Sequence, residues 1–344
     1  MPRLTRDKQW LKGHRKRSCS KSSCYERLLF TMAAEKFVKI QAYKGLISAP
    51  FTAFKENGEL NPDVIPKYVD HLVRLGVKGV FVNGTTGEGL SLTVEERKIT
   101  AESWVKHGKN KLELVIIQVG ANSVKDAQEL AAHAEKIGAT GIASLPPLFY
   151  KPQTHDHLIA YFKKLADAAP NSPLMLYHIP AYSNVEIQLA EFMPRARKAV
   201  PNFCGAKYTS TEVRDLLHCH SLPGEPFKLL SGYDEVLLPC LSCGVSAAVG
   251  ASYNFMGPLG LRILEAFNKG EMEKARKLQS QTLDAILTIT KHGQGIACFK
   301  AVMNILGPID VGQPRVPLVP LSADALCKLK EDLKLLKPEE WHKF

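Results

Sequence analysis

The sequence predicts an α/β protein, because eight short apolar segments alternate with amphipathic helical segments from residue 45 onward. The apolar segments run for four to six residues, as buried parallel strands do, and the segments between them follow the 3.6-residue period of helices. Eight such units within roughly 210 residues are the number that a closed parallel barrel needs. We therefore predict a (β/α)8 TIM barrel over residues 42–256.

Both kinds of segment can be placed along the chain. In order, the predicted strands are Gly45–Ala49, Gly79–Asn83, Leu114–Val119, Gly141–Leu145, Leu174–His178, Phe203–Tyr208, Lys228–Ser231 and Ser246–Gly250. The helical segments between them include Val64–Leu75, Val94–Lys106, Val124–Ile137, His157–Ala168 and Glu212–His220.

Several helical segments carry capping signals. Thr93 precedes Glu96 at capping-box spacing, and Ser123 precedes Asp126 at the same spacing. Other segments end on a glycine, where a left-handed residue closes the last turn; these glycines are Gly76, Gly108 and Gly138.

A doubly wound open sheet is the alternative arrangement of alternating strands and helices. A Gly-x-Gly-x-x-Gly turn after the first strand would favour that sheet. The first strand is followed instead by Pro50-Phe51-Thr52, so the closed barrel is preferred.

After Tyr253 the strand signals stop and the remaining sequence is helical in period. We expect residues 257–344 to form a C-terminal helical extension that packs on the outside of the barrel. Its predicted helices are Pro258–Lys269, Met272–Lys291, Ile296–Ile305 and Ala323–Leu335.

The first 41 residues are predicted to be a basic, disordered leader outside the fold. Nine Lys or Arg and only two acidic residues precede Met32, so this stretch carries seven of the eleven net positive charges. It has no core-forming pattern, and it is either a mitochondrial transit segment or a leader that the working protein does not need. Met32 is a plausible alternative start. Without a transit segment, we expect a cytoplasmic protein.

The rest of the chain has an ordinary charge balance, which predicts neither a nucleic-acid nor a membrane partner. No apolar run approaches the roughly 18 residues that a spanning helix needs, so we expect a soluble protein. The eight cysteines show no framework spacing and fit a reducing compartment. Cys240 and Cys243 form a lone C-x-x-C, and Cys219 lies between two histidines; we expect idle thiols and no metal site.

Functional groups of a parallel barrel gather at the C-terminal ends of its strands. Lys207 stands at the end of the sixth strand, where loss of water lowers the pKa of an amine. A neutral amine is what a Schiff base with a ketone requires. The commonplace alternative is a lysine whose ammonium reaches the rim.

Three further strand ends carry polar groups. The turn Gly84-Thr85-Thr86-Gly87-Glu88 after strand two is rich enough in glycine to bring amides and hydroxyls against a small anion. Strand five ends in Tyr177, and strand seven leads to Asp234 and Glu235. Each has an ordinary reading, as a plain turn, a packed aromatic or helix-capping acids, and only their joint position favours a site.

These segments resemble three signatures of the pyruvate-dependent aldolase family, which includes dihydrodipicolinate synthase and N-acetylneuraminate lyase. The matching motifs are Gly84-Thr85-Thr86-Gly87-Glu88, Tyr177-His178-Ile179-Pro180 and Gly205-Ala206-Lys207. The resemblance extends from about residue 44 to beyond Pro317 and omits the leader. It implies a class I aldolase that uses no metal or organic cofactor, and it also implies a homotetramer.

The resemblance assigns roles to the matching residues. Lys207 forms the Schiff base with the keto carbon of pyruvate, and Tyr177 is the acid/base that handles the hydroxyl proton of the bond being cleaved. Thr86 and the adjoining amides hold the carboxylate, and Thr85 takes part in both carboxylate binding and the proton relay.

The residues that meet the other half of the substrate favour sialic acid. Dihydrodipicolinate synthases carry an arginine shortly after the tyrosine motif, and none occurs in Ile179–Val185. Gly232-Tyr233-Asp234-Glu235 resembles the polyol-binding turn of the sialic acid lyases, and Thr209 matches a hydroxyl contact in them. The resemblance thus implies reversible cleavage of N-acetylneuraminate to pyruvate and N-acetylmannosamine.

Two positions depart from the family pattern. Many lyases have a serine where Ala251 stands, and Ser252 is a candidate to replace that sugar contact. Phe149 aligns with a tyrosine that completes the proton relay across a subunit boundary in many relatives, and the neighbouring Tyr150 is a candidate for that role.

Two other functions remain open from the sequence. A mitochondrial 4-hydroxy-2-oxoglutarate aldolase would agree with the basic leader, but it would not need Asp234 and Glu235. A catalytically silent relative that binds a keto acid would not need the complete set of Lys207, Tyr177 and Thr85.

Overall fold

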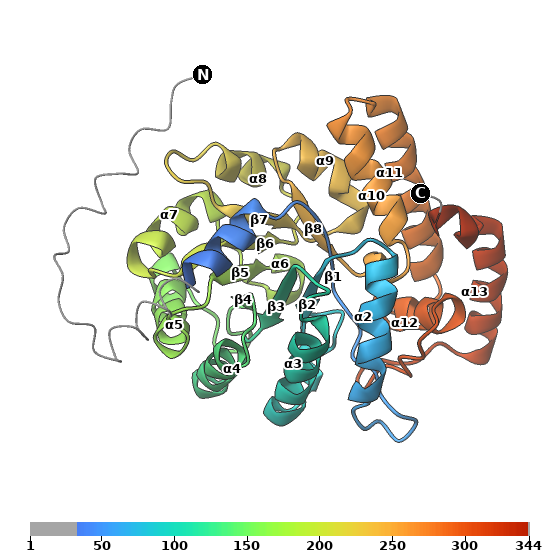
Figure 1. The fold of residues 1–344 in the computed structure, drawn as a ribbon, viewed down its shortest axis with the longest axis horizontal. Coiled ribbons are helices and arrows are strands. Elements are labelled where there is room, and N and C mark those ends of the chain that lie inside the picture. The colour runs from blue at the N-terminus through green and yellow to red at the C-terminus, as the bar shows by residue number, and fades with distance from the viewer. Residues whose placement is uncertain (1–32, 343–344) are drawn as a thin grey trace.

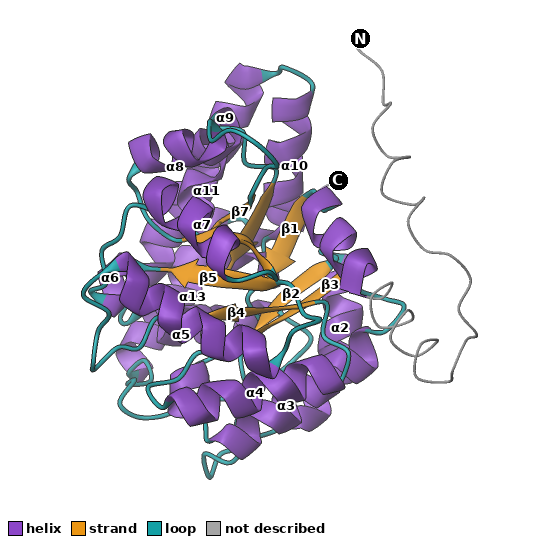
Figure 2. Ribbon diagram, turned by 90° about the vertical axis from the view of Figure 1, so that its left-hand side faces the viewer, coloured by secondary structure: helices purple, strands orange, loops and turns teal. Residues whose placement is uncertain are grey.

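The computed structural model describes residues 33–342 of the chain. Its eight parallel strands form a closed barrel in sequence order, with β8 paired to β1. Helices surround the strands in both views (Figure 1, Figure 2). The (β/α)8 prediction is confirmed. The strands are β1 (Gly45–Ser48), β2 (Gly79–Val82), β3 (Leu114–Gln118), β4 (Gly141–Ser144), β5 (Leu174–His178), β6 (Phe203–Tyr208), β7 (Lys228–Ser231) and β8 (Ala247–Gly250).

Alternate side chains of the strands separate into two apolar regions, because successive residues of a strand point to opposite faces. One set fills the inside of the barrel, where Phe81, Ile116, Met175 and Leu230 belong to one buried cluster. The other set, which includes Val80, packs beneath the surrounding helices in a larger cluster. The inside of the barrel is therefore a filled core.

The surrounding helices match the predicted segments to within two residues at most ends. They are α2 (Ile65–Arg74), α3 (Val94–Gly108), α4 (Val124–Lys136), α5 (His155–Ala168), α7 (Leu189–Ala199), α8 (Val213–His220) and the short α6 (Pro180–Ser183) and α9 (Leu237–Ser242). Single 3-10 turns are η2 (Pro62–Val64), η3 (Gly89–Ser91), η4 (Asp234–Val236), η5 (Ser252–Asn254) and η6 (Pro338–His342).

The capping predictions can be checked residue by residue. Thr93 and Glu96 form a complete capping box, and Ser123 accepts a hydrogen bond from the Asp126 amide. Gly76 and Gly138 have the expected left-handed backbone, with φ of +73° and +87°. Helix α3 ends at Gly108 as predicted, but Gly108 is not left-handed. Asn110 takes the left-handed conformation two residues later, at φ 64°.

Four longer helices follow the last strand and gather on one side of the barrel (Figure 1). They are α10 (Gly257–Asn268), α11 (Met272–Thr290), α12 (Gly295–Leu306) and α13 (Ala323–Leu336). The predicted division at residue 257 assigns α10 to the extension. However, α10 lies so close to β1 that a Cβ on Gly260 would come within 2.8 Å of Leu46 Cδ1. It is therefore the outer helix of the eighth unit, and the extension proper begins with α11.

A helix of residues 33–42 lies at the N-terminal end of the barrel. Its Ile40 is 1% exposed and belongs to the cluster inside the barrel. Gln41 donates a hydrogen bond to the Cys204 carbonyl at the start of β6, and Lys228 at the start of β7 donates to the Tyr43 carbonyl. The prediction of a disordered leader up to residue 41 is therefore wrong for residues 33–41, because this helix supplies an apolar plug. The remainder of that prediction lies outside the described residues.

Two features of the described part of the chain bear on function. Within residues 33–342 no helix combines the length and apolar character that crossing a bilayer requires. The same residues contain no group of three or more His, Cys, Asp or Glu side chains arranged to hold a metal ion.

Candidate active site

A cavity of about 290 Å³ opens at the C-terminal end of the barrel strands. Nine of the ten residues that the sequence singles out line it, although they come from five different strand ends. They are Thr85, Thr86, Tyr177, Lys207, Thr209, Gly232, Asp234, Glu235 and Ala251. Parallel strands bring these residues together because their carboxyl ends meet at one face of the barrel.

Lys207 is a buried amine inside an apolar barrel. Its side chain is next to that of Tyr177, because these two residues are register partners on β5 and β6. The Lys207 Nζ atom lies 4.1 Å from the ring centroid of Tyr177 and 4.4 Å from that of Phe81. Burial lowers the pKa of Lys207 to about 7, against the opposing attraction of the Asp234 carboxylate. At neutral pH, Lys207 is therefore a neutral, nucleophilic amine in a substantial fraction of the molecules.

Tyr177 connects this amine to the glycine-rich turn after β2. Its hydroxyl oxygen lies 2.9 Å from Thr85 Oγ1, within hydrogen-bonding distance. Burial raises the pKa of Tyr177 to about 12, although the hydrogen bond with Thr85 partly offsets that effect. The phenol therefore keeps its proton at neutral pH, and any transfer through it passes along the hydrogen bond to Thr85.

The turn that carries Thr85 and Thr86 is closed by a glycine that no larger residue can replace. A Cβ on Gly89 would lie 1.9 Å from the carbonyl oxygen of Asn83, so no side chain fits at that position. The Glu88 amide donates to the Thr85 carbonyl over 3.0 Å, and Glu88 itself is left-handed at φ 51°. This compact turn presents both threonines to the cavity.

Asp234 begins the turn after β7 and is 5% exposed. Burial raises its pKa to about 6, while hydrogen bonds from Ser252 and the charge of Lys207 lower it. One carboxylate oxygen accepts a hydrogen bond from the Ser252 amide over 2.8 Å. A Cβ on Gly250 would lie 1.6 Å from the other oxygen, so the glycine at the end of β8 makes room for this carboxylate.

The sequence suggests that Ser252 contacts the sugar, but in the structure Ser252 does not reach the cavity. It is fully buried, it does not line the cavity, and its amide serves Asp234. The reason is that η5 begins at Ser252. This helical turn carries Ser252 behind Asp234 and leaves the Ala251 position facing the cavity. The prediction that Ser252 replaces the missing serine contact is therefore wrong for this structure.

The extension supplies a wall of the cavity that no motif indicates. Its lining residues on α11 and α12 are Ile286, Leu287, Thr290, Gly295, Ile296 and Phe299. Gln279 of α11 holds the turn that carries Asp234. It donates to the Asp234 carbonyl over 3.1 Å and accepts from the Leu238 amide over 2.8 Å. The helical period alone gives no signal for these roles, because it does not tell which face of α11 meets the barrel.

Phe149 and Tyr150 lie outside this cavity. Both belong to the loop after β4 and are 77% and 86% exposed, and their rings contact each other edge to face. The relay role of Tyr150 across a subunit boundary stays a prediction.

The chain is similar to known proteins over most of its length. Residues 42–336 match the model of the dihydrodipicolinate synthetase family. The chain is 44% identical over 293 residues to an N-acetylneuraminate lyase of Gallus gallus, covering 85% of this chain and 95% of that protein. It is 44% identical over 295 residues to an N-acetylneuraminate lyase of Homo sapiens, covering 85% and 92%.

A solved structure of Proteus mirabilis N-acetylneuraminate lyase superimposes with a TM-score of 0.82 at 36% identity, covering 86% of this chain and 99% of that one. The family match and these relatives agree with the motifs and with the geometry around Lys207. This chain belongs to the dihydrodipicolinate synthetase family.

Proposed function

We propose that this protein is a class I aldolase that reversibly cleaves N-acetylneuraminate to pyruvate and N-acetylmannosamine through a Schiff base on Lys207. One observation carries the proposal. A buried lysine with a pKa of about 7 lies against Tyr177, whose hydroxyl is hydrogen-bonded to Thr85, in a cavity at the catalytic end of a barrel. The similarity to N-acetylneuraminate lyases supports the choice of substrate.

The reaction begins when the neutral amine of Lys207 adds to the keto carbon of open-chain N-acetylneuraminate and water leaves. The product is a protonated imine, which accepts electrons. The hydroxyl beta to the imine carbon gives its proton to the Tyr177 oxygen as Tyr177 passes its own proton to Thr85. Thr85 in turn gives its hydroxyl proton to the substrate carboxylate that its turn holds, so no charge remains on either side chain, and the same relay returns the proton when the enamine is protonated. The carbon–carbon bond then breaks, and its electron pair moves into the imine to form an enamine. N-acetylmannosamine departs as an aldehyde. Protonation of the enamine and hydrolysis of the imine release pyruvate.

Thr85, Thr86 and the amides of their turn hold the carboxylate of the pyruvate unit in this proposal. Their position supports it, since both threonines line the cavity on the side of Tyr177. Hydrogen bonds to a carboxylate from a rigid turn orient the keto carbon toward the amine and lower the entropic part of the barrier.

The opposite end of the cavity is suited to a sugar chain. Asp234, Glu235 and Thr209 supply oxygen atoms around Gly232 and Ala251, and carboxylates form strong hydrogen bonds with several hydroxyls. The same two acids would repel a substrate with a second carboxylate. The run Ile179–Val185 contains no arginine to compensate for them.

The proposal includes a homotetramer located in the cytoplasm, and catalysis without a metal or organic cofactor. Pyruvate, N-acetylmannosamine and sialic acid are the expected small-molecule partners. Sedimentation of the purified protein tests the tetramer.

Borohydride trapping tests the proposed function directly. The protein is incubated with N-acetylneuraminate, reduced with borohydride and mapped by peptide mass spectrometry. The added mass of a reduced pyruvyl group is expected on the Lys207 peptide. Label on a different lysine, or a protein that turns over 4-hydroxy-2-oxoglutarate and leaves sialic acid intact, would contradict the proposal.

A further inference from the structure

A buried ion pair ties the carboxylate-binding turn to the C-terminal extension. Glu88 follows Thr86 by two residues, and its carboxylate lies 2.7 Å from the Lys300 Nζ atom of α12. The exposed fractions of the two side chains are 0% and 1%. The second carboxylate oxygen of Glu88 accepts a hydrogen bond from the Arg315 amide over 2.8 Å. Neither residue lines the cavity that contains Lys207.

The partners of Glu88 are themselves fixed from several sides. Lys300 also donates to the Gln313 carbonyl over 3.1 Å, and its ammonium lies 4.4 Å from the ring centroid of Phe54. The Arg315 guanidinium forms two hydrogen bonds with the Glu96 carboxylate of α3, over 2.9 and 2.7 Å. Lys300 and Arg315 therefore connect three parts of the chain: α12, the segment after it and the N-terminus of α3.

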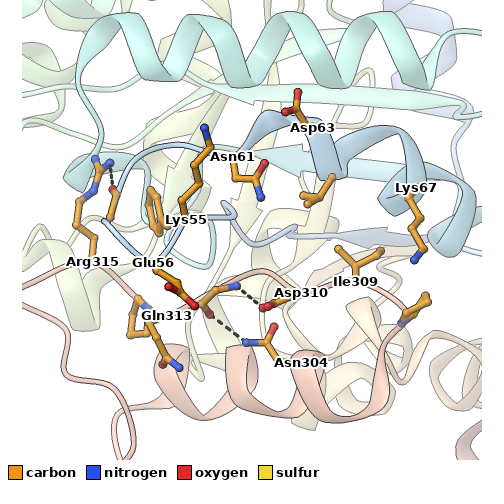
Figure 3. A pocket seen from close by; sticks show the side chains of 16 residues that line it. Lys55, Glu56, Asn61, Asp63, Lys67, Asn304, Ile309, Asp310, Gln313 and Arg315 are labelled. Carbon is orange, nitrogen blue, oxygen red and sulfur yellow. Dashed lines mark hydrogen bonds between the residues drawn. The ribbon is translucent and has the colours of Figure 1, made fainter.

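The segment after α12 has open space beside part of it, and these polar contacts hold it there. A cavity of about 760 Å³ separates part of it from the loop after β1. In Figure 3 the Asn304 amide reaches the segment, donating to the Gly312 carbonyl, and Arg315 bonds to the opposite wall of this cavity. Ile309 and Val311 of this segment are buried in the main apolar cluster, and the hydrogen bonds together with the Glu88 contact fix the part that follows them.

We propose that Glu88 and Lys300 are positioning residues for pyruvate. Through their ion pair, the affinity of the Thr85–Thr86 turn for the pyruvate carboxylate depends on the position of α12 against the barrel. The inference rests on the proposed function, since it assumes that the Thr85–Thr86 turn holds the carboxylate. A buried ion pair is a weak source of stability, because desolvation offsets much of the attraction, but it fixes geometry. The Glu88 amide bonds to the Thr85 carbonyl, so a shift of Glu88 moves the threonine that contacts Tyr177.

The test compares three variants with the parent protein: Lys300→Met, Glu88→Gln/Lys300→Met, and Val302→Ala as the matched control. Val302 lies on the same helix and is fully buried, but it has no part in the ion pair. Three quantities are measured: the pyruvate concentration that gives half-maximal borohydride labelling of Lys207, the KM for N-acetylmannosamine at saturating pyruvate, and the Tm.

We expect Lys300→Met to raise the half-maximal pyruvate concentration roughly tenfold, as small displacements at a binding turn do. The KM for N-acetylmannosamine should change less than about twofold, because the sugar end has separate supports. The double variant removes the unpaired buried charge, so its Tm should recover while its pyruvate affinity stays low. Val302→Ala should lower the Tm through its cavity and leave pyruvate affinity unchanged.

Recovery of both Tm and pyruvate affinity in the double variant would overturn the inference, since the pair would then only stabilise the fold. An equal loss of pyruvate affinity in Val302→Ala would overturn it as well. If Lys300→Met does not fold, the double variant and the control still decide the question. Failure of the parent protein to label with pyruvate would refute the proposed function instead, and the two failures are thus distinguishable.

Discussion

The two ends of the proposed substrate cavity are built differently. At the proposed pyruvate end, Lys207 and Tyr177 lie on neighbouring strands in register, and the barrel interior surrounds them. At the proposed sugar end, Asp234 and Ala251 lie beyond the strands, at the 3-10 turns η4 and η5. Contacts with Ser252 and with Gln279 of α11 hold Asp234 there.

This difference suggests a division of labour within one cavity. Groups that break bonds require fixed positions, and paired strands provide them. Groups that select the substrate lie on turns, whose sequence can change without disturbing the barrel. Substitutions at the pyruvate end should therefore abolish the reaction, whereas those at the sugar end should change the substrate preference.

The largest effect is expected from Lys207→Ala and from Lys207→Arg. Both should fold and lose cleavage, because a methyl group has no amine and a guanidinium cannot become a nucleophilic one. The measurements are turnover of N-acetylneuraminate and the circular dichroism spectrum. Residual turnover close to that of the parent protein would show that another group forms the imine.

Tyr177→Phe should reduce kcat by about a hundredfold or more, the range of positioned proton transfer. Because the amine remains, borohydride labelling of Lys207 with pyruvate alone should persist in this variant. The matched variant Thr85→Val removes the hydrogen-bond partner of Tyr177 and should lower kcat by a smaller factor. If Tyr177→Phe left kcat unchanged, the proton would have to follow a different route.

Asp234→Asn should have a moderate effect, which at a pH above the Lys207 pKa falls mainly on the sugar. An amide keeps a hydrogen bond but loses charge assistance, a difference of about 1–2 kcal/mol, which corresponds to roughly five- to thirtyfold in kcat/KM for N-acetylneuraminate. Labelling by pyruvate alone should hardly change. Equal or improved turnover of 4-hydroxy-2-oxoglutarate, in a protein inactive on sialic acid, would instead assign the acids to a different substrate.

The pH dependence of kcat/KM tests the electrostatic interaction between Asp234 and Lys207. The expected change is smaller than those of the substitutions above. With a Lys207 pKa of about 7, kcat/KM should rise with pH through about 7 and then level off, as the ammonium loses its proton. The Asp234 charge raises the pKa of Lys207, so Asp234→Asn should move the acidic limb to lower pH. Glu235→Gln is the control and should leave the limb in place, whatever its effect on the maximum. Movement of the limb to higher pH in Asp234→Asn would contradict the assigned electrostatics.

The smallest effect is expected from removing the residues before Met32. A protein that starts at Met32 keeps the helix of residues 33–42 and its buried Ile40. Turnover and Tm should therefore match those of the full chain. A further truncation to residue 43 removes the plug, and we expect it to lower the Tm. Equal Tm values for the two truncations would show that the helix is dispensable.

The sequence by itself determined the barrel and the position of Lys207, Tyr177, Thr85 and Thr86 at one face of it. The period of its apolar residues gave every strand to within one residue at each end, because strand burial in a parallel barrel is nearly complete. Lys207, Tyr177, Thr85 and Thr86 could be found as strand-end residues, since the closure of the barrel brings those ends together whatever the details of packing.

Only the tertiary structure decided what surrounds these groups. The burial of Ser252 behind Asp234 depends on where η5 begins, which no residue pattern indicates. The contacts of Gln279 and Lys300 join positions 45 and 212 residues apart along the chain. A helical period shows that α11 and α12 have apolar faces, but packing alone decides that these faces meet the barrel at its catalytic end. The plug formed by residues 33–42 was missed for the same reason, because its partners are strand starts distant in sequence.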